Sequence, residues 1–102
     1  MSIKKSFLKT KPQANVTFKL PAEAAEGASK VTLVGEFNDW NETSTELKKL
    51  KSGIFKTTLK LETGKEYQFR YLIDGEKWEN DWAADKYVAT EVSFEENSVV
   101  AL

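Results

Sequence analysis

The sequence predicts an all-β domain built as an antiparallel β-sandwich. Several short stretches alternate apolar with polar residues, and clusters of turn-forming residues separate them. No stretch carries a sustained helical pattern, which favours two packed sheets over a mixed fold. With 102 residues the chain is long enough for one hydrophobic core and too short for two, so we expect a single domain over residues 1–102.

The first part of the chain is predicted to contain an edge strand or arm, followed by a half-buried strand. Residues 1–14 form the edge strand or arm, and Pro12 separates it from the half-buried strand. The stretch from Val16 to Leu20 places apolar residues at every second position, and Pro21 ends it. Residues 22–29 are rich in alanine but interrupted by glycine, so we expect a loop with at most one helical turn.

The next predicted strand leads into a corner that is dense in turn-forming residues. Residues 30–35 alternate again, and the sequence EFNDWN of residues 36–41 follows them directly. Leu47 and Leu50, in the polar stretch after the corner, are expected to contact the core. The corner is therefore predicted to be structured, and it carries Trp40.

A strand-turn unit in the second half of the chain is the most regular part of the sequence. Residues 54–61 form one alternating strand, and residues 67–73 form the next. Every second residue of the latter strand forms its core face: Tyr67, Phe69, Tyr71 and Ile73. Arg70 lies on the opposite face. Asp74-Gly75 then tolerates the positive backbone dihedrals of a tight turn, and Trp78 follows it.

The pattern weakens toward the C-terminus. We expect Trp82 mainly to pack the loop of residues 80–86, with ligand binding as the alternative. Residues 87–94 fit either a strand or an ordered loop, and residues 99–102 are predicted to form a terminal strand.

Composition excludes several classes of function. The chain has no cysteine and no histidine, which excludes disulfides, the usual zinc sites and the Ser-His or Cys-His nucleophilic systems. The net charge is −1 with both signs interspersed, which argues against a nucleic-acid or membrane surface. No apolar run could span a bilayer and no secretory signal is evident, so we expect a cytoplasmic protein. A local excess of lysines before residue 12 is attributed to a solvated edge: Lys4, Lys5, Lys9 and Lys11.

Three motifs resemble those of the family-48 carbohydrate-binding modules. They are VTLVGEFNDW at residues 31–40, YQFRYLIDGEKW at residues 67–78 and ENSVV at residues 96–100, in the family's order. This family includes the early-set domain preceding isoamylases and branching enzymes, and the glycogen-binding domain of the AMP-activated kinase beta subunit. The resemblance covers residues 16–102 and is greatest to bacterial stand-alone versions. It implies an immunoglobulin-like early-set sandwich that binds alpha-1,4-glucans.

The resemblance also implies four carbohydrate-binding residues. Trp40 closes the GxFNxW motif, and Arg70 takes the basic position four residues before the Asp of the Asp-Gly turn. Trp78 follows that turn with one extra residue between, and Asn97 begins the motif of the last strand. The tryptophan rings would stack on pyranose faces, and the guanidinium group would bond neighbouring hydroxyl groups.

Alternative roles exist for these residues. Both tryptophans would also suit a plug at the end of the sandwich, and Arg70 would also suit a surface ion pair with Asp74 or Glu76. The chain departs from the family just before Asn97, where many relatives have a Phe-Gly pair and residues 92–95 read VSFE. Without the glycine, the loop that brings Asn97 to the sugar is predicted to take another path.

The sequence thus predicts a non-catalytic module, without metal or cofactor, that binds glycogen, starch or malto-oligosaccharides. A glycosidase needs two carboxyl groups that face one bond. Asp74 is instead explained by its turn, and Asp81 and Asp85 by a loop whose polar groups satisfy one another. These two with Glu79 could hold calcium, but no EF-hand loop is present.

Two other functions remain open at this point. One is a protein–protein interaction module, in which the same aromatic side chains would be buried against a partner. The other is an ancillary domain of a family-13 glycoside hydrolase system without its own glucan site. A glycogen- or starch-metabolising enzyme is the expected protein partner in these cases.

Overall fold

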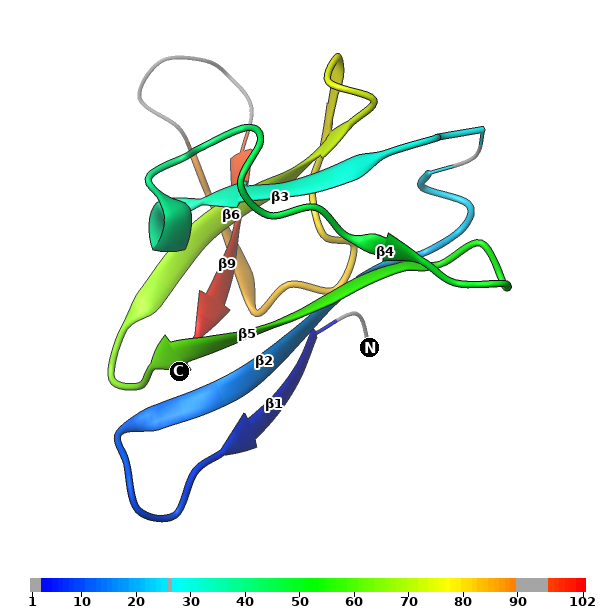
Figure 1. The fold of residues 1–102 in the computed structure, drawn as a ribbon. Helices are drawn as coiled ribbons and strands as arrows, with labels where there is room; N and C mark the ends of the chain where they lie inside the picture. The colour runs from blue at the N-terminus through cyan, green and yellow to red at the C-terminus, as the bar shows by residue number, and fades with distance from the viewer. Residues whose placement is uncertain (1–2, 26, 90–95) are drawn as a thin grey trace.

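The computed structural model describes residues 3–25, 27–89 and 96–102, which form two antiparallel sheets packed face to face (Figure 1). The first sheet has the strand order β1-β2-β5-β4, and the second has the order β3-β6-β9-β8 with β7 also paired to β6. The bounds are β1 Ile3–Phe7, β2 Gln13–Leu20, β3 Val31–Gly35, β4 Lys48–Lys49, β5 Phe55–Glu62, β6 Glu66–Ile73, β7 Lys77–Glu79, β8 Lys86–Ala89 and β9 Glu96–Ala101. The predicted sandwich is confirmed.

Most of the predicted elements are present, and β2, β6 and β9 begin earlier than the alternation alone indicated. The edge-strand alternative holds for the N-terminal region, because β1 pairs with β2 along its whole length. The alanine-rich stretch forms turns, with the Ala24 N–H donating to Pro21 O at 3.0 Å. The ambiguous stretch of residues 87–94 contributes to β8 as far as Ala89. Residues 90–95, which include the departure from the family at residues 92–95, lie outside the described residues.

The core lies between the sheets and is lined by the residues that alternation predicts. In β2 every second side chain is fully buried, and in β6 the aromatic side chains of Phe69 and Tyr71 are fully buried as well. Phe18 and Phe69 meet edge to face, with their ring centroids 5.1 Å apart. Leu47 contacts this core as predicted and is 4% exposed.

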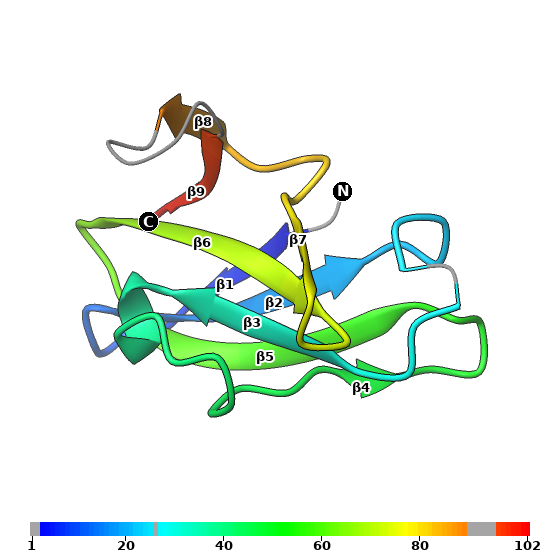
Figure 2. The ribbon, with the colours of Figure 1, turned by 90° about the horizontal axis from the view of Figure 1, so that it is seen from above.

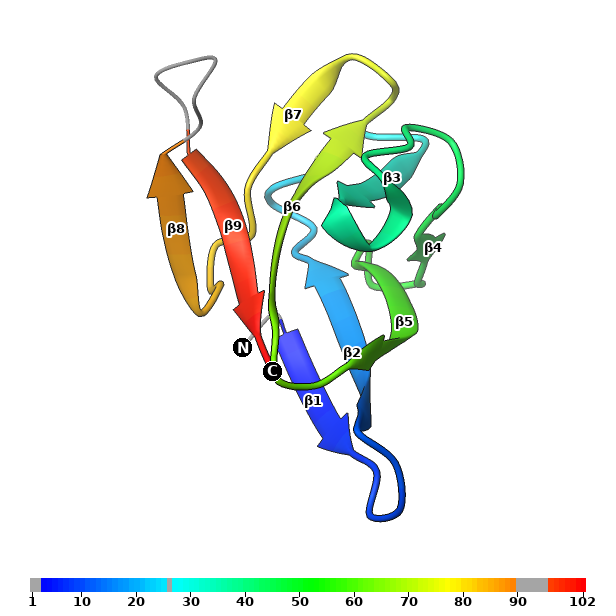
Figure 3. The same ribbon diagram turned by 90° about the vertical axis from the view of Figure 1, so that its left-hand side faces the viewer.

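One short segment belongs to both sheets. Leu33 N–H donates to Thr45 O at 2.7 Å and Leu47 N–H to Val31 O at 2.8 Å, so residues 45–47 pair with β3. The next two residues form β4 and pair with β5 in the other sheet. Figure 3 shows β3 and β4 on the same side of the molecule, joined by this crossing segment.

The opposite side of the sandwich is closed by side chains. Here β8 is the last strand of its sheet, seen apart from β3 in Figure 2, and β1 is the edge of the other sheet. Lys5 Nζ of β1 lies 2.7 Å from Asp85 Oδ2, which also accepts the Ala101 N–H at 2.7 Å. Partial burial would raise the pKa of Asp85, but the Ala101 hydrogen bond and the Lys5 charge outweigh it and lower the pKa.

The described segments contain no helix of the length and apolar character that a membrane crossing requires. Their one helical element is a 3-10 turn, Glu36–Asn38, at the corner after β3.

Candidate functional site

The corner after β3 is fixed by three residues of the GxFNxW motif. A Cβ on Gly35 would lie 2.7 Å from Gln68 O and 2.7 Å from Phe69 Cβ, so the motif glycine is required by close strand approach. Phe37 packs its ring against the core, 5.6 Å from the Phe18 ring centroid. Asn38 accepts the Gly35 N–H at 3.1 Å and donates to Leu33 O at 2.9 Å. These residues therefore have structural roles.

Trp40 is the member of this motif whose side chain is not required by the core. The backbone N–H of Trp40 donates to Gly35 O at 2.8 Å, and the Trp40 φ of 57° lies in the left-handed region. That conformation costs a bulky residue about 1–3 kcal/mol and persists only where the surroundings impose it. The Trp40 side chain is nevertheless 39% exposed. The corner thus holds an exposed indole in a constrained backbone position.

The turn between β6 and β7 follows the sequence prediction. Asp74 and Gly75 have φ values of 52° and 69°, and the Glu76 N–H donates to Ile73 O at 3.0 Å. Asp74 Oδ1 also accepts the N–H groups of Ser29 and Lys30, each at 2.8 Å. The aspartate therefore fixes both its own turn and the loop that enters β3, which is a structural role.

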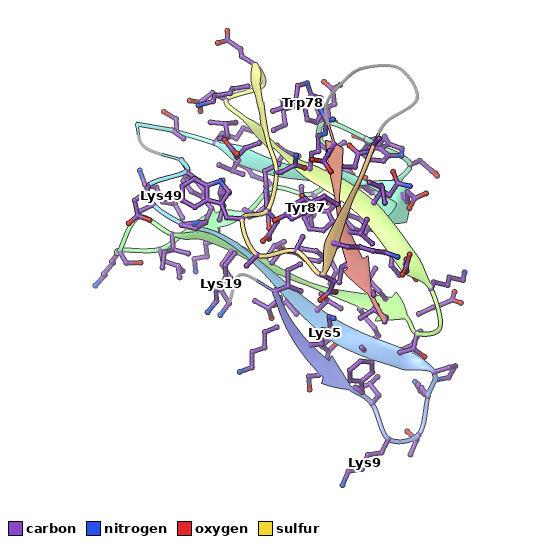
Figure 4. All side chains as sticks on the ribbon, turned by 180° about the vertical axis from the view of Figure 1, so that it is seen from behind. Lys5, Lys9, Lys19, Lys49, Trp78 and Tyr87 are labelled. Carbon is purple, nitrogen blue, oxygen red and sulfur yellow. The ribbon has the colours of Figure 1, made fainter. Side chains whose placement is uncertain are left out.

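Arg70 and Trp78 lie on the same face of the second sheet. Leu72 and Arg70 alternate with the core residues of β6 and so point away from the core, and Trp78 is the cross-strand partner of Leu72. Diagonal neighbours such as Arg70 and Trp78 are about 7–8 Å apart between backbone positions. Arg70 is half-buried and Trp78 is 39% exposed. Trp78 lies at the top of the molecule in Figure 4.

This outer face has an apolar layer of its own. Val34 is the cross-strand partner of Arg70 and is 1% exposed, and Leu72 and Val99 are 4% and 1% exposed. None of these three belongs to the core cluster between the sheets. A packed layer therefore supports Arg70 and Trp78 from below, and Trp40 is anchored beside it through Gly35, the neighbour of Val34.

Asn97 lies on the same face in β9, but it is less accessible than the other predicted site residues. Gln68 of β6 and Val99 of β9 are cross-strand partners in an antiparallel pair. Two residues further along β6 and two residues back along β9, Arg70 is therefore opposite Asn97. Asn97 is 9% exposed, and its amide nitrogen donates to Gln68 Oε1 at 3.0 Å. Arg70, Trp78 and Asn97 therefore lie on one face of the second sheet, and Trp40 belongs to the corner that follows β3 of the same sheet.

Trp82 departs from its expected packing role. Its side chain is 54% exposed, more than that of Trp40 or Trp78. The indole N–H donates to Glu79 Oε1 at 3.2 Å, and Glu79 is the partner of Tyr71 on the core-facing side of the sheet. The prediction that Trp82 mainly packs its loop is therefore wrong, because more than half of the residue is exposed.

A buried polar network next to the site was not predicted from the sequence. Asp81 is 1% exposed and accepts the Tyr71 hydroxyl at 2.7 Å, while its N–H donates to Ser98 Oγ at 2.8 Å. Burial, together with the charge of Asp81 and its hydrogen bond, raises the pKa of Tyr71 well above 10.0. Asp81 thus bonds beyond its own loop, contrary to expectation. In the sequence, Ser98 was the available sign of a buried polar contact, because it is a polar residue within an apolar strand.

The exposed side chains of this face are of types that suit ligand binding. The exposed indoles of Trp40 and Trp78 can cover the apolar faces of a ligand, and the Arg70 guanidinium group can donate to its polar edges. Within the described ranges, no group of three or more Asp, Glu, His or Cys side chains could hold a metal ion, so Asp81, Asp85 and Glu79 form no such group. Asp85 instead pairs with Lys5.

Comparison with known proteins identifies similar sequences. The family model for carbohydrate-binding module 48 (isoamylase N-terminal domain) matches residues 8–88. The chain is also 33% identical over 75 residues to Protein PTST homolog 2, chloroplastic, of Arabidopsis thaliana. That alignment covers 72% of this chain and 13% of the plant protein, so the chain spans a small part of that relative's length.

Proposed function

The chain belongs to the carbohydrate-binding module 48 family, and from this premise we propose that it is a non-catalytic module that binds alpha-1,4-glucans such as glycogen, starch or malto-oligosaccharides. Family membership by itself implies carbohydrate binding. The choice of glucan, the binding residues and the absence of catalysis are our inference. The narrower resemblance to bacterial stand-alone versions stays a prediction.

The observation that carries the proposal is that Arg70 and Trp78 share one sheet face while Trp40 is exposed on the corner that follows β3 of the same sheet. Trp40 keeps a strained backbone conformation although its side chain is 39% exposed, and Trp78 is equally exposed. Residues that only fill the end of a sandwich would be expected to be buried, as Phe37 partly is. Exposed, rigidly placed indoles instead suit stacking on a ligand that is absent from the free protein.

We assign a role to each residue of this face. Trp40 and Trp78 stack on successive glucose units, and Arg70 between them donates to hydroxyl groups at the sugar edges. Asn97 positions the floor of the site through Gln68 rather than leading the contact with the sugar, since it is 9% exposed. Because hydroxyl bonds replace bonds to water, we expect affinities on the order of micromolar to millimolar.

The proposal is tested by glycogen-affinity electrophoresis and by calorimetric titration with a long malto-oligosaccharide. Trp40→Ala and Trp78→Ala should each weaken binding at least about tenfold, which corresponds to about 1.4 kcal/mol. Phe7→Ala is the matched control, because Phe7 is an aromatic residue with 56% exposure on the other sheet. A beta-1,4-linked oligosaccharide of the same length checks the linkage.

Different results distinguish the competing functions. If the wild-type protein binds neither glycogen nor the malto-oligosaccharide, the glucan proposal is wrong and the protein-docking alternatives take its place. If it binds but folded Trp40→Ala and Trp78→Ala proteins bind equally well, the site lies elsewhere. Equal losses in Phe7→Ala would show that the tryptophan effects are not specific to this face.

A further inference from the structure

A set of five lysines covers the outer face of the first sheet, on the side of the molecule opposite to the proposed glucan site. We call it the lysine face, and it consists of Lys4, Lys19, Lys48, Lys56 and Lys60. In β2 and β5 these side chains alternate with buried core residues, so they point away from the core. Figure 4 shows Lys9, at the tip of the adjoining β1–β2 hairpin, at the opposite end of the molecule from Trp78.

The strand register brings three of these charges into one row. Lys56 is the cross-strand partner of Lys19 on one side and of Lys48 on the other. Adjacent strands are about 4.8 Å apart, and like charges directly opposite one another destabilise a sheet. The row therefore works against the stability of the fold.

Among the described residues, no ion pair neutralises this row. The ion pairs formed by lysines in the described residues are Lys5–Asp85, Lys65–Glu62 and Lys86–Glu66, and none involves the lysine face. Glu62 is the one carboxylate at an outward position of these four strands, whose residues are all described, and it lies at the far end of β5. The lysine face is thus strongly cationic although the whole chain has a net charge of −1.

Protection of sheet edges explains only part of the pattern. Lysines on edge strands prevent pairing with other chains, which suits Lys4 on β1 and Lys48 on β4. Lys19 and Lys56 are on β2 and β5, the two central strands, where no edge needs protection. Their charges are therefore better explained by a partner.

We propose that the lysine face binds an acidic polypeptide segment, such as an Asp- and Glu-rich stretch of a partner protein. The other outward residues of the face are polar, among them Thr17 and Thr58, whose hydroxyl groups are 2.9 Å apart. The face has no aromatic side chain to stack on nucleic-acid bases and no apolar side chain to enter a membrane. It also has no guanidinium fork for bidentate phosphate binding. Flexible lysines on a flat sheet suit a flexible chain of carboxylates.

The binding of a fluorescently labelled Glu-rich peptide, measured by anisotropy at low salt, tests the proposal. Lys48→Gln/Lys56→Gln should weaken binding about tenfold, whereas the matched double variant Lys30→Gln/Lys77→Gln should stay within about twofold of wild type. Lys30 directly precedes β3 and Lys77 lies in β7, so both are outside the first sheet. Binding should also fall as salt rises, because the screening length shortens from about 10 Å at 0.1 M to about 3 Å at 1 M.

Three controls keep the result interpretable. Thermal unfolding of Lys48→Gln/Lys56→Gln should occur at the wild-type temperature or higher, since the change relieves repulsion. Glycogen retention by this variant should equal that of wild type, and Trp40→Ala should keep peptide binding. Because the two ligands use opposite faces, failure of either proposal leaves the other testable.

Two kinds of result would refute the proposal. No peptide binding at low salt, or equal weakening in both double variants, would refute the lysine face. Tighter binding of single-stranded DNA or of phosphatidylserine vesicles than of the peptide, with the same dependence on Lys48 and Lys56, would refute the polypeptide as its partner.

Discussion

The outer faces of the two sheets differ in what lies beneath their exposed side chains. On the second sheet, Val34, Leu72 and Val99 form a buried layer that supports Arg70 and Trp78. On the first sheet, the outward positions of β2 and β5 carry lysines, hydroxyl or amide side chains and one carboxylate, Glu62, with no apolar layer. One face is packed and presents rigid rings, while the other is solvated and presents mobile charges.

The difference has a physical consequence for recognition. A stacking site needs its rings held in place before the ligand arrives, because ordering them on binding would weaken the affinity. An electrostatic surface needs no such order, since charges act over several ångströms. The same fold thus supports a shape-dependent face and a charge-dependent face.

The largest expected effect comes from removing the packed layer. Leu72→Ala should lower the free energy of unfolding by about 3 kcal/mol, because it leaves a cavity under Trp78, whereas Lys56→Gln should change it by less than about 0.5 kcal/mol. Urea unfolding of both variants measures the contrast. Similar changes in the two variants would remove the distinction between the faces.

A smaller effect is expected at the corner that holds Trp40. Asn38→Ala removes side-chain bonds to Gly35, Leu33 and Thr45 and should cost about 2 kcal/mol. Without these bonds the strained conformation of Trp40 should relax, so the folded variant should also bind malto-oligosaccharides more weakly. Calorimetric titration well below the unfolding temperature checks this. Unchanged affinity would mean that Asn38 does not position the indole.

The ion pair between Lys5 and Asp85 is expected to contribute less, about 0.5–1 kcal/mol, because solvent screens it. The pKa of Asp85 is lowered in the folded protein from 3.8, so this contribution is present above that pH and lost as pH falls through the folded-state pKa. The stability difference between wild type and Lys5→Gln should therefore shrink on acidification. Urea unfolding at successive pH values below about 5 measures it, and a constant difference would contradict the assignment.

The smallest expected effect concerns the third tryptophan. Trp82→Ala should leave glycogen retention within about twofold of wild type, because the indole bonds Glu79 on the core-facing side of the sheet. Affinity electrophoresis beside Trp78→Ala gives the comparison. A loss as large as that of Trp78→Ala would extend the glucan site around the sheet edge to Trp82.

Much of the fold could be predicted because apolar residues at every second position of a strand are the ones whose side chains are buried. The core face of Tyr67, Phe69 and Tyr71 follows from period-two spacing, and Asp74-Gly75 follows from the dihedral needs of a tight turn. The grouping of Arg70 with Trp78 was likewise accessible, since both positions are set by the register of one hairpin. The use of these residues in sugar binding stays a prediction.

Other features depend on contacts between distant segments, which periodicity does not encode. The burial of Asp81 depends on Tyr71 and Ser98 approaching it from two other strands. The small exposure of Asn97 depends on Gln68 in the neighbouring strand. The lysine row could not be predicted because Lys19, Lys48 and Lys56 are far apart in sequence and meet only through strand pairing.

The segment of residues 45–49 joins the two sheets along one side of the sandwich, whereas side chains such as Lys5 and Asp85 join them along the other. Separating the sheets at the first side breaks the backbone hydrogen bonds that this segment makes to β3 or β5, while separating them at the second breaks side-chain contacts. We therefore expect partial opening to begin at β1 and β8, and the amide protons of β3 and β5 to exchange with solvent last. Because the corner that holds Trp40 follows β3, we expect it to stay assembled during such partial opening.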